Sequence, residues 1–224
     1  MMRFQTPYRY TDRKTKARYI WLKYHLILNG HILDVGADKC YLKQYLNITV
    51  EYWGIGLGGS PDQQVDLETG NIPFSDNSFD CVLCFDVLEH LENIHKIFDE
   101  VCRISKRYVI ISLPNPYAAF WNMLLYGYYK PDLAMKFYGL PLEKPEDRHK
   151  WFFSQKESEE FIKYRSKKNN MEIVQMDIED YNKASLLETF CQKVLFKKYT
   201  DFGNLHAGSL WAVLEKIPSG RFSV

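Results

Sequence analysis

The feature that most constrains the fold is a recurrence of short apolar runs separated by helical or turn-rich segments. Runs of this kind occupy residues 31–35, 50–55, 80–85 and 108–113. The last of them, YVIISL, is apolar and rich in β-branched residues, which is typical of a strand buried on both faces. Helical patterns at 39–46 and 91–104 separate these runs. Strands that alternate with helices predict a parallel, doubly wound α/β sheet.

The pattern continues on both sides of these runs. Further elements are predicted at 12–28 (helix), 64–66 (edge strand), 154–168 (helix), 172–178 (strand), 183–197 (helix) and 209–214 (strand). Ser154 and Glu157 stand in the register of a capping box, which predicts where the helix at 154 begins. We expect a single domain over residues 1–224, with an N-terminal helical segment at about 1–30.

Residues 114–153 interrupt the alternation of strands and helices. This segment contains five of the nine prolines and eleven aromatic residues. We interpret it as an aromatic and proline-rich insertion after the fifth strand. Its rings are suited to a mobile lid and to the wall of a binding site, and they also suit the core of an ordinary subdomain.

Composition excludes several classes of function. Lysine and arginine number 29 against 28 acidic residues, so no net field favours nucleic acid or an anionic membrane. The basic cluster at 13–18, RKTKAR, is interpreted as a solvated helix face. The N-terminus, MMRFQTPYRY, lacks the apolar stretch of a signal peptide, and no run is long enough to span a membrane. We therefore expect a soluble cytoplasmic protein. The sequence gives no prediction of its oligomeric state.

Two cysteines form a CxxC pattern inside a predicted strand. A strand has a period of two, so Cys81 and Cys84 point to opposite faces and suit neither zinc nor a redox pair. We interpret them as small core residues.

Two segments carry the candidate chemistry. In the first, LDVGADKC, an apolar strand ends in Asp34 and Gly36 and opens a helix, a turn that brings the backbone close to a ligand and aims free N–H groups at it. An ordinary strand-to-helix turn has the same pattern. The second segment, residues 52–90, reads YWGIGLGGSPDQQVDLETGNIPFSDNSFDCVLCFDVLEH. Together they resemble the cofactor-binding half of class I S-adenosylmethionine-dependent methyltransferases, of the small-molecule, type 11 kind.

The resemblance implies a seven-stranded, mostly parallel sheet with a reversed last strand, and S-adenosyl-L-methionine as cofactor. Asp34 would hold the amino group of the methionine part, and Asp66 would accept a hydrogen bond from the adenine amine. The family has glycines where Asp38 and Cys40 stand, and an acid for the ribose where Gly56 stands. The implied cofactor-binding residues are Asp34, Gly36, Ala37, Asp38, Gly56, Leu57, Asp66, Leu67, Asp86 and Val87. Asp62 is a candidate to replace the missing ribose acid.

The implied catalytic residues are two histidines. His90 ends the phrase Asp86-Val-Leu-Glu89-His90, which binds a divalent metal in some relatives and binds none in many others. We expect no metal. His149 stands in DRHKWFFS, which resembles a stretch beside the family's acceptor site. It is predicted to be a general base or an orienting donor, and a histidine in an aromatic run also serves structural roles.

The resemblance implies methyl transfer to a small or medium acceptor molecule. Two alternatives stay open. Asp38, Cys40 and Gly56 also suit a protein of this fold that has lost catalysis and binds a ligand or partner. A dehydrogenase on the same sheet is disfavoured because it would leave Asp66 and the phrase PFSDNSFD unexplained.

Overall fold

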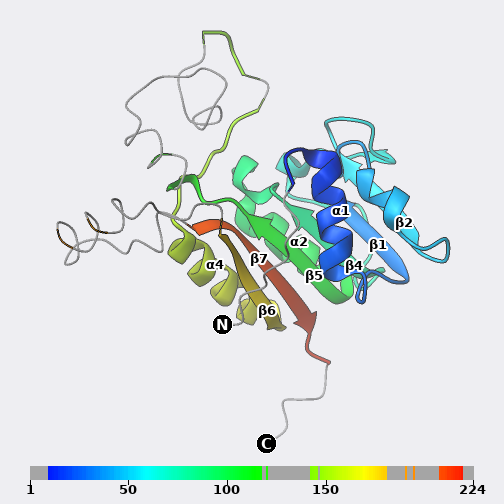
Figure 1. Cartoon of the computed structure of the whole chain (residues 1–224). Helices are drawn as coiled ribbons and strands as arrows, with labels where there is room; N and C mark the ends of the chain where they lie inside the picture. The colour runs from blue at the N-terminus through cyan, green and yellow to red at the C-terminus, as the bar shows by residue number, and fades with distance from the viewer. Residues whose placement is uncertain are drawn as a thin grey trace, which may run out of the picture.

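The computed structural model describes residues 10–117, 120, 142–145, 147–180, 190, 194 and 207–218. Within these residues the strands form one seven-stranded sheet in the order β3-β2-β1-β4-β5-β7-β6 (Figure 1). The strands are β1 His31–Val35, β2 Glu51–Gly56, β3 Gln63–Gln64, β4 Phe79–Phe85, β5 Ser105–Leu113, β6 Met171–Asp180 and β7 Ala207–Lys216. Only β7 is antiparallel to its neighbours, β5 and β6. The predicted doubly wound sheet with a reversed last strand is confirmed.

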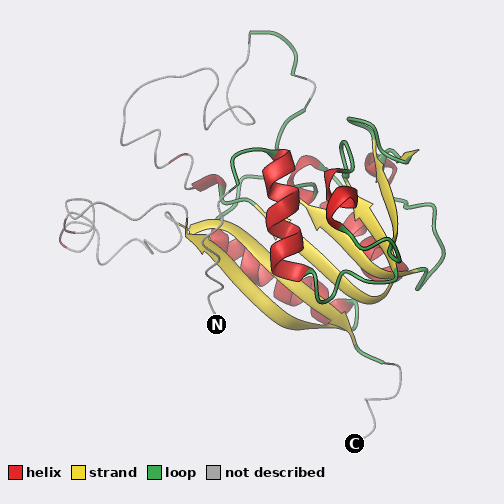
Figure 2. Ribbon diagram, turned by 45° about the vertical axis from the view of Figure 1, so that its right-hand side comes forward, coloured by secondary structure: helices red, strands yellow, loops and turns green. Residues whose placement is uncertain are grey.

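Helices cover both faces of this sheet. They are α1 Arg13–Tyr24, α2 Ile94–Ile104 and α4 Gln155–Lys168, with short 3-10 helices η1 Tyr41–Tyr45, η2 Leu67–Thr69 and η3 Leu88–His90. The apolar side chains of α1 and η1 pack in one hydrophobic cluster, and those of α2 and α4 pack in another. The sheet therefore lies between two layers of helix (Figure 2).

Local sequence explains where the long helices begin. Asp12 accepts a hydrogen bond from the backbone N–H of Thr15 at 2.8 Å, and the Thr15 hydroxyl accepts from the N–H of Asp12, so α1 opens with a capping box. Ser154 and Glu157 form the same reciprocal pair at the start of α4. Each pair satisfies two backbone donors that the first turn leaves unpaired.

One predicted helix is wrong in length and type. Residues 39–46 form only the short 3-10 helix η1, because Asp38 and Cys40 both have a φ of 51°. Two left-handed residues just ahead of it prevent a regular α-helical start. The helix predicted at 183–197 lies outside the described residues except for 190 and 194. Most of the insertion predicted at 114–153 lies outside them too.

The cysteine interpretation is confirmed. Cys81 belongs to the cluster under α1, and Cys84 belongs to the cluster under α2, so the two thiols lie on opposite faces of β4. Among the described residues, no helix is long and apolar enough to cross a membrane.

Helix α1 is tied to the far edge of the sheet. Lys23 of α1 forms an ion pair with Asp177 of β6 at 3.3 Å, and their side chains are only 1% and 3% exposed. Trp211 of β7 is fully buried beneath α1, with its ring 5.4 Å from that of Tyr19 and 6.2 Å from that of Tyr24. Side chains of the two last strands thus hold the N-terminal helix.

The last strand also holds the end of α2. The Lys216 ammonium of β7 donates hydrogen bonds to the carbonyls of Cys102 at 2.9 Å and Ser105 at 2.6 Å, and to Oδ1 of Asn77 at 2.8 Å. A cation at a helix C-terminus is favourable because the last carbonyls have no partner within the helix.

The order of the strands places a binding edge at β1. The chain passes from β1 to β2 on one side and later returns to β4 on the other side. In doubly wound sheets, ligands bind in the crevice beyond the carboxyl ends of strands at such a switch point.

Candidate functional site

A cavity of about 720 Å³ lies at the carboxyl ends of β1, β2 and β4. Its size is within the usual range for ligand sites. All twelve residues predicted from the sequence line it: Asp34, Gly36, Ala37, Asp38, Gly56, Leu57, Asp66, Leu67, Asp86, Val87, His90 and His149. The structure thus brings the predicted set together, and the role of each member stays a prediction.

The loop after β1 approaches its neighbours closely. A Cβ on Gly36 would lie 2.2 Å from Cγ2 of Val87, and φ at Gly36 is 79°, so only glycine fits here. The expectation of free N–H groups is wrong for the first two residues of this loop. The amides of Gly36 and Ala37 donate to the carbonyl of Ile55 at 2.8 and 3.1 Å, which joins the loop to β2.

Asp34 is a buried carboxylate at the end of β1. Its Oδ2 accepts a hydrogen bond from the Tyr52 hydroxyl at 2.6 Å. Burial raises the pKa of Asp34 to about 6, although the bond from Tyr52 and the charge of Lys16 act in the opposite direction. A cationic group bound beside Asp34 would favour its ionised form.

Asp38 and Cys40 both adopt a left-handed backbone conformation, which is more usual for glycine. Both have the left-handed φ of 51° that a glycine adopts without strain. Asp38 also forms an ion pair with Arg13 of α1 at 2.8 Å, across the mouth of the loop. The loop therefore carries two side chains on left-handed backbone, a conformation that glycine adopts without strain.

The end of β2 carries no acid, and Asp62 does not replace one. Oδ2 of Asp62 accepts from the backbone N–H of Gly54 at 2.9 Å, and Oδ1 pairs with Lys43 at 3.1 Å. Asp62 is not among the residues that line the cavity, whereas Gly56 and Leu57 are.

The residues after β3 present an acid and a buried apolar side chain. Oδ1 of Asp66 accepts from the N–H of Glu68 at 2.9 Å and caps η2. Leu67 is buried beside it. Asp66 itself is exposed, and both residues line the cavity. This placement suits the predicted adenine site.

Asp86 is held by a lysine that the sequence did not point to. Lys16 of α1 forms an ion pair with Asp86, and the Ser112 hydroxyl donates to Oδ1 of Asp86 at 2.6 Å. Burial raises the pKa of Asp86, but Lys16 and Ser112 outweigh it and hold that pKa below its usual value. The interpretation of RKTKAR as a solvated face is wrong for Lys16, whose side chain is only 12% exposed.

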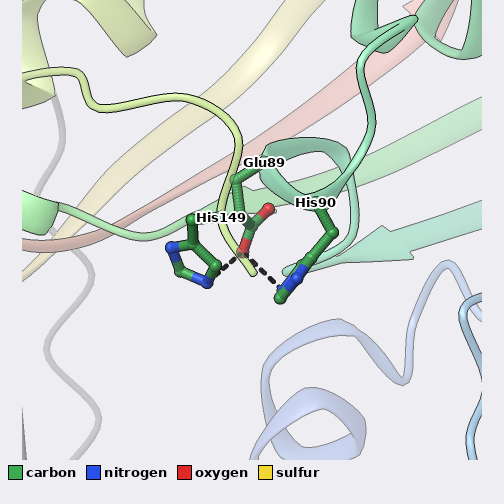
Figure 3. A group of neighbouring side chains, drawn as sticks. All are labelled: Glu89, His90 and His149. Atoms are coloured by element: carbon green, nitrogen blue, oxygen red, sulfur yellow. Dashed lines mark ion pairs between the residues drawn. The ribbon is translucent and has the colours of Figure 1, made fainter. Parts of the chain in front are cut away.

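Glu89, His90 and His149 form a cluster (Figure 3), and all three line the cavity. Oε1 of Glu89 lies 3.8 Å from Nε2 of His90 and 4.0 Å from Nε2 of His149. Burial and the nearby Asp86 raise the pKa of Glu89 well above its usual value. Burial and the adjacent His90 lower the pKa of His149 to about 4, so its imidazole is neutral at neutral pH.

The segment 147–153 covers this cluster. The backbone N–H of Lys150 donates to the carbonyl of Glu89 at 2.8 Å, and the Trp151 indole N–H donates to the carbonyl of Leu91 at 2.7 Å. Oδ1 of Asp147 lies 2.7 Å from Nδ1 of His90. The part of the insertion that the structure describes therefore borders the site.

Comparison with known proteins agrees with this geometry. A family model described as "Methyltransferase domain" matches residues 55–112, which is less than half of the chain. No curated protein matches the sequence.

Similar folds occur among solved structures. An S-adenosylmethionine-dependent methyltransferase from Archaeoglobus fulgidus has a TM-score of 0.55 at 14% identity, over 91% of this chain and 94% of that one. The magnesium protoporphyrin IX methyltransferase ChlM from Synechocystis, with bound S-adenosylhomocysteine, has a TM-score of 0.53 at 13% identity, over 91% and 83%. The chain therefore has the fold of the class I S-adenosylmethionine-dependent methyltransferases, and it carries their methyltransferase domain signature over residues 55–112.

One solved structure of similar fold is a cyclase. The cyclase SpnF has a TM-score of 0.50 at 11% identity, over 96% of this chain and 86% of that one. At such identities a likeness shows the fold alone, so the activity of this chain rests on its own site.

Proposed function

We propose that this chain binds S-adenosyl-L-methionine and transfers its methyl group to a small or medium acceptor. The observation that carries the proposal is the order of groups in the cavity. The buried acid Asp34 lies near the end of β1, Gly56 ends β2, and the exposed acid Asp66 follows β3. This is the order in which the family meets the amino, ribose and adenine parts of the cofactor.

The residues present fit that cofactor in part. Asp34 offers a carboxylate to the ammonium, and Gly36 lets Val87 pack directly against the loop backbone while both residues line the cavity. Gly56 offers the ribose no acid. A charge-assisted hydrogen bond is worth roughly 1.5–3 kcal/mol, so we expect an affinity that is modest for the family.

The cofactor supplies a methyl group on a positively charged sulfur, which becomes neutral as the carbon–sulfur bond breaks and its electron pair stays on sulfur. The protein's task is to align the acceptor, exclude water and let the acceptor lose a proton. His90 and His149 line the cavity beside the segment 147–153. We propose that these two histidines contact the acceptor molecule.

Calorimetric titration of the full chain with S-adenosylhomocysteine tests cofactor binding. We expect binding by the wild type and a loss of roughly tenfold in Asp66→Ala, because the adenine amine loses its acceptor. The matched control is Asp76→Ala, an exposed acid outside the cavity that pairs with Arg103. It should bind as the wild type does. The absence of any heat at millimolar ligand would reject the proposal.

The alternative is a methyltransferase-fold protein that binds a ligand without catalysis, and the missing acid at Gly56 favours it. Incubation of the protein with methyl-labelled S-adenosylmethionine and fractionated small molecules separates the two. Label in an acceptor supports the enzyme. Tight cofactor binding with no labelled product in any fraction supports the alternative.

A further inference from the structure

Glu89 is an unsatisfied acid in the interior. Its side chain is fully buried, and within the described residues neither carboxylate oxygen has a hydrogen-bond partner. Ionised, both oxygens lack a donor, and protonated, the O–H lacks an acceptor. Buried polar groups are nearly always paired, so this exception requires a physical reason.

Two imidazoles converge on the same carboxylate. One ligand atom each from Glu89, His90 and His149 lie within 4.8 Å of one another (Figure 3). The Glu89 Oε1 distances to the two Nε2 atoms are 3.8 and 4.0 Å. Nitrogen and oxygen ligands about 2.1 Å from one ion lie about 3 to 3.5 Å apart. A shift of under about 1 Å in each side chain would therefore bring the three ligand atoms to the spacing that one metal ion requires.

The surroundings orient these ligands as metal sites require. Asp147 lies 2.7 Å from Nδ1 of His90, which leaves Nε2 directed toward Glu89. A carboxylate on the second nitrogen of a ligating histidine fixes the ring and raises its basicity. The backbone bond from Lys150 to the Glu89 carbonyl holds His149 beside the same carboxylate.

We infer that Glu89, His90 and His149 bind a divalent transition-metal ion. Two imidazoles and one carboxylate suit zinc, cobalt, manganese or iron(II) better than magnesium or calcium, which prefer oxygen ligands. Asp86 is not part of this set, and its two oxygens interact with Lys16 and Ser112. This differs from the expectation drawn from the sequence. There, the candidate ligands were Asp86, Glu89 and His90, whereas the fold supplies His149 as the third one.

The position of the cluster gives the ion a role that rests on the proposed function. Three protein ligands leave at least one coordination position, and these residues line the cavity next to the covering segment. A cation there would polarise an oxygen of the acceptor and lower the pKa of a hydroxyl, so that its proton would pass more readily to water while the oxygen takes the methyl group. The acceptor class that fits is a molecule methylated on a hydroxyl oxygen.

The test is a titration of Co²⁺ into the chelator-treated full chain, followed by calorimetry and by visible ligand-field absorption. We expect one equivalent to bind, with nitrogen ligation seen in the spectrum. Glu89→Gln and His149→Gln should each weaken binding at least tenfold. Asp147→Asn, an exposed position that should leave folding intact, should weaken it about tenfold through His90.

His25→Gln is the matched control, since His25 is exposed and lies outside the cavity. It should bind Co²⁺ as the wild type does. The inference is overturned if the wild type binds no stoichiometric ion, or if Asp147→Asn and His149→Gln bind it as the wild type does. Thermal unfolding of each variant shows whether a loss reflects the ligand or the fold.

The experiments can reject either of the two proposals without rejecting the other. Titration of the chelated wild type with S-adenosylhomocysteine reports the cofactor site alone, because Asp34 and Asp66 are not ligands of the ion. Cobalt binding without cofactor binding leaves the metal site and rejects the methyltransferase. The reverse result rejects the metal site only.

Discussion

At the scale of single residues, the burial of Asp34 disfavours the ionised form of its carboxyl group. Its pKa of about 6 lies above the ordinary value of 3.8, so the folded chain holds a proton that the unfolded chain has released between these values. The contribution of Asp34 to stability is therefore greatest at low pH and declines as the pH rises from about 4 to about 6. An ammonium group bound beside Asp34 would favour the ionised carboxylate and so reverse the effect of burial.

This reversal predicts the pH dependence of cofactor binding. We expect S-adenosylhomocysteine to bind about tenfold more weakly at pH 5 than at pH 7.5, because only about a tenth of Asp34 is ionised at pH 5. Asp34→Asn should bind weakly at both values and show a much flatter profile. Calorimetry at the two pH values measures it. A wild-type affinity that is equal at both would show that Asp34 does not hold the ammonium.

Several residues of the site could be predicted from the sequence for a local reason. Gly36, Asp66 and Asp86 each end or follow a strand, and the ends of parallel strands meet at one edge of a sheet. Lys16 could not be predicted, because it stands in a charged helix whose sequence does not show which face is covered. The approach of His149 to Glu89 spans 60 residues with no local signal.

At the scale of elements, helix α1 is fixed by charge as well as by apolar contact. The Lys23 ammonium pairs with Asp177 and lies 5.2 Å from the centre of the Trp211 ring. Burial lowers the pKa of Lys23, and the charge of Asp177 acts against that shift. A buried ion pair of this kind costs more when one partner is removed than when both are replaced.

We therefore expect Lys23→Met to lower the free energy of unfolding by about 3–5 kcal/mol, since it leaves Asp177 charged and buried. The double variant Lys23→Met/Asp177→Leu should regain most of that loss. Arg107→Met is the control, because its pair with Glu215 is exposed and worth about 1 kcal/mol or less. Denaturant unfolding of the three variants decides it. Equal losses for Lys23→Met and Arg107→Met would contradict the prediction.

The elements themselves follow the sequence closely where the signal is local. Apolar runs predicted the strands and apolar spacing predicted α1, while Ser154 and Glu157 predicted the start of α4. Helix η1 is shorter than predicted because the pattern at 39–46 does not show that Asp38 and Cys40 adopt left-handed backbone. The sequence alone did not give the reversal of β7, which came from the family resemblance.

At the scale of the whole molecule, β7 connects parts of the chain that are far apart. It lies between β5 and β6, places Trp211 under α1 and sends Lys216 to the end of α2. These contacts join the first helix, the middle of the chain and the last strand into one core.

Lys216→Met should lower the free energy of unfolding by about 2 kcal/mol, because the carbonyls at the end of α2 lose a charged donor. For a chain of this size that is a fall in the midpoint of about 4–8 °C, measured by calorimetry. Lys106→Met, on an exposed lysine that pairs with Asp80, should change the midpoint little. A midpoint for Lys216→Met that matches that of Lys106→Met would show that the bonds at α2 are worth no more than a surface contact.

The place of β7 in the sheet has a consequence for synthesis of the protein. Every described residue that lines the cavity lies between Arg13 and Lys150, yet β7, whose Trp211 packs against α1, spans residues 207–216. A ribosome therefore makes these cavity residues well before it makes the strand on which α1 rests. A nascent chain, or one cut short before residue 207, carries these side chains without the Trp211 ring against which α1 packs. We expect such a chain to hold the α1 side of the cavity less firmly than the full chain does.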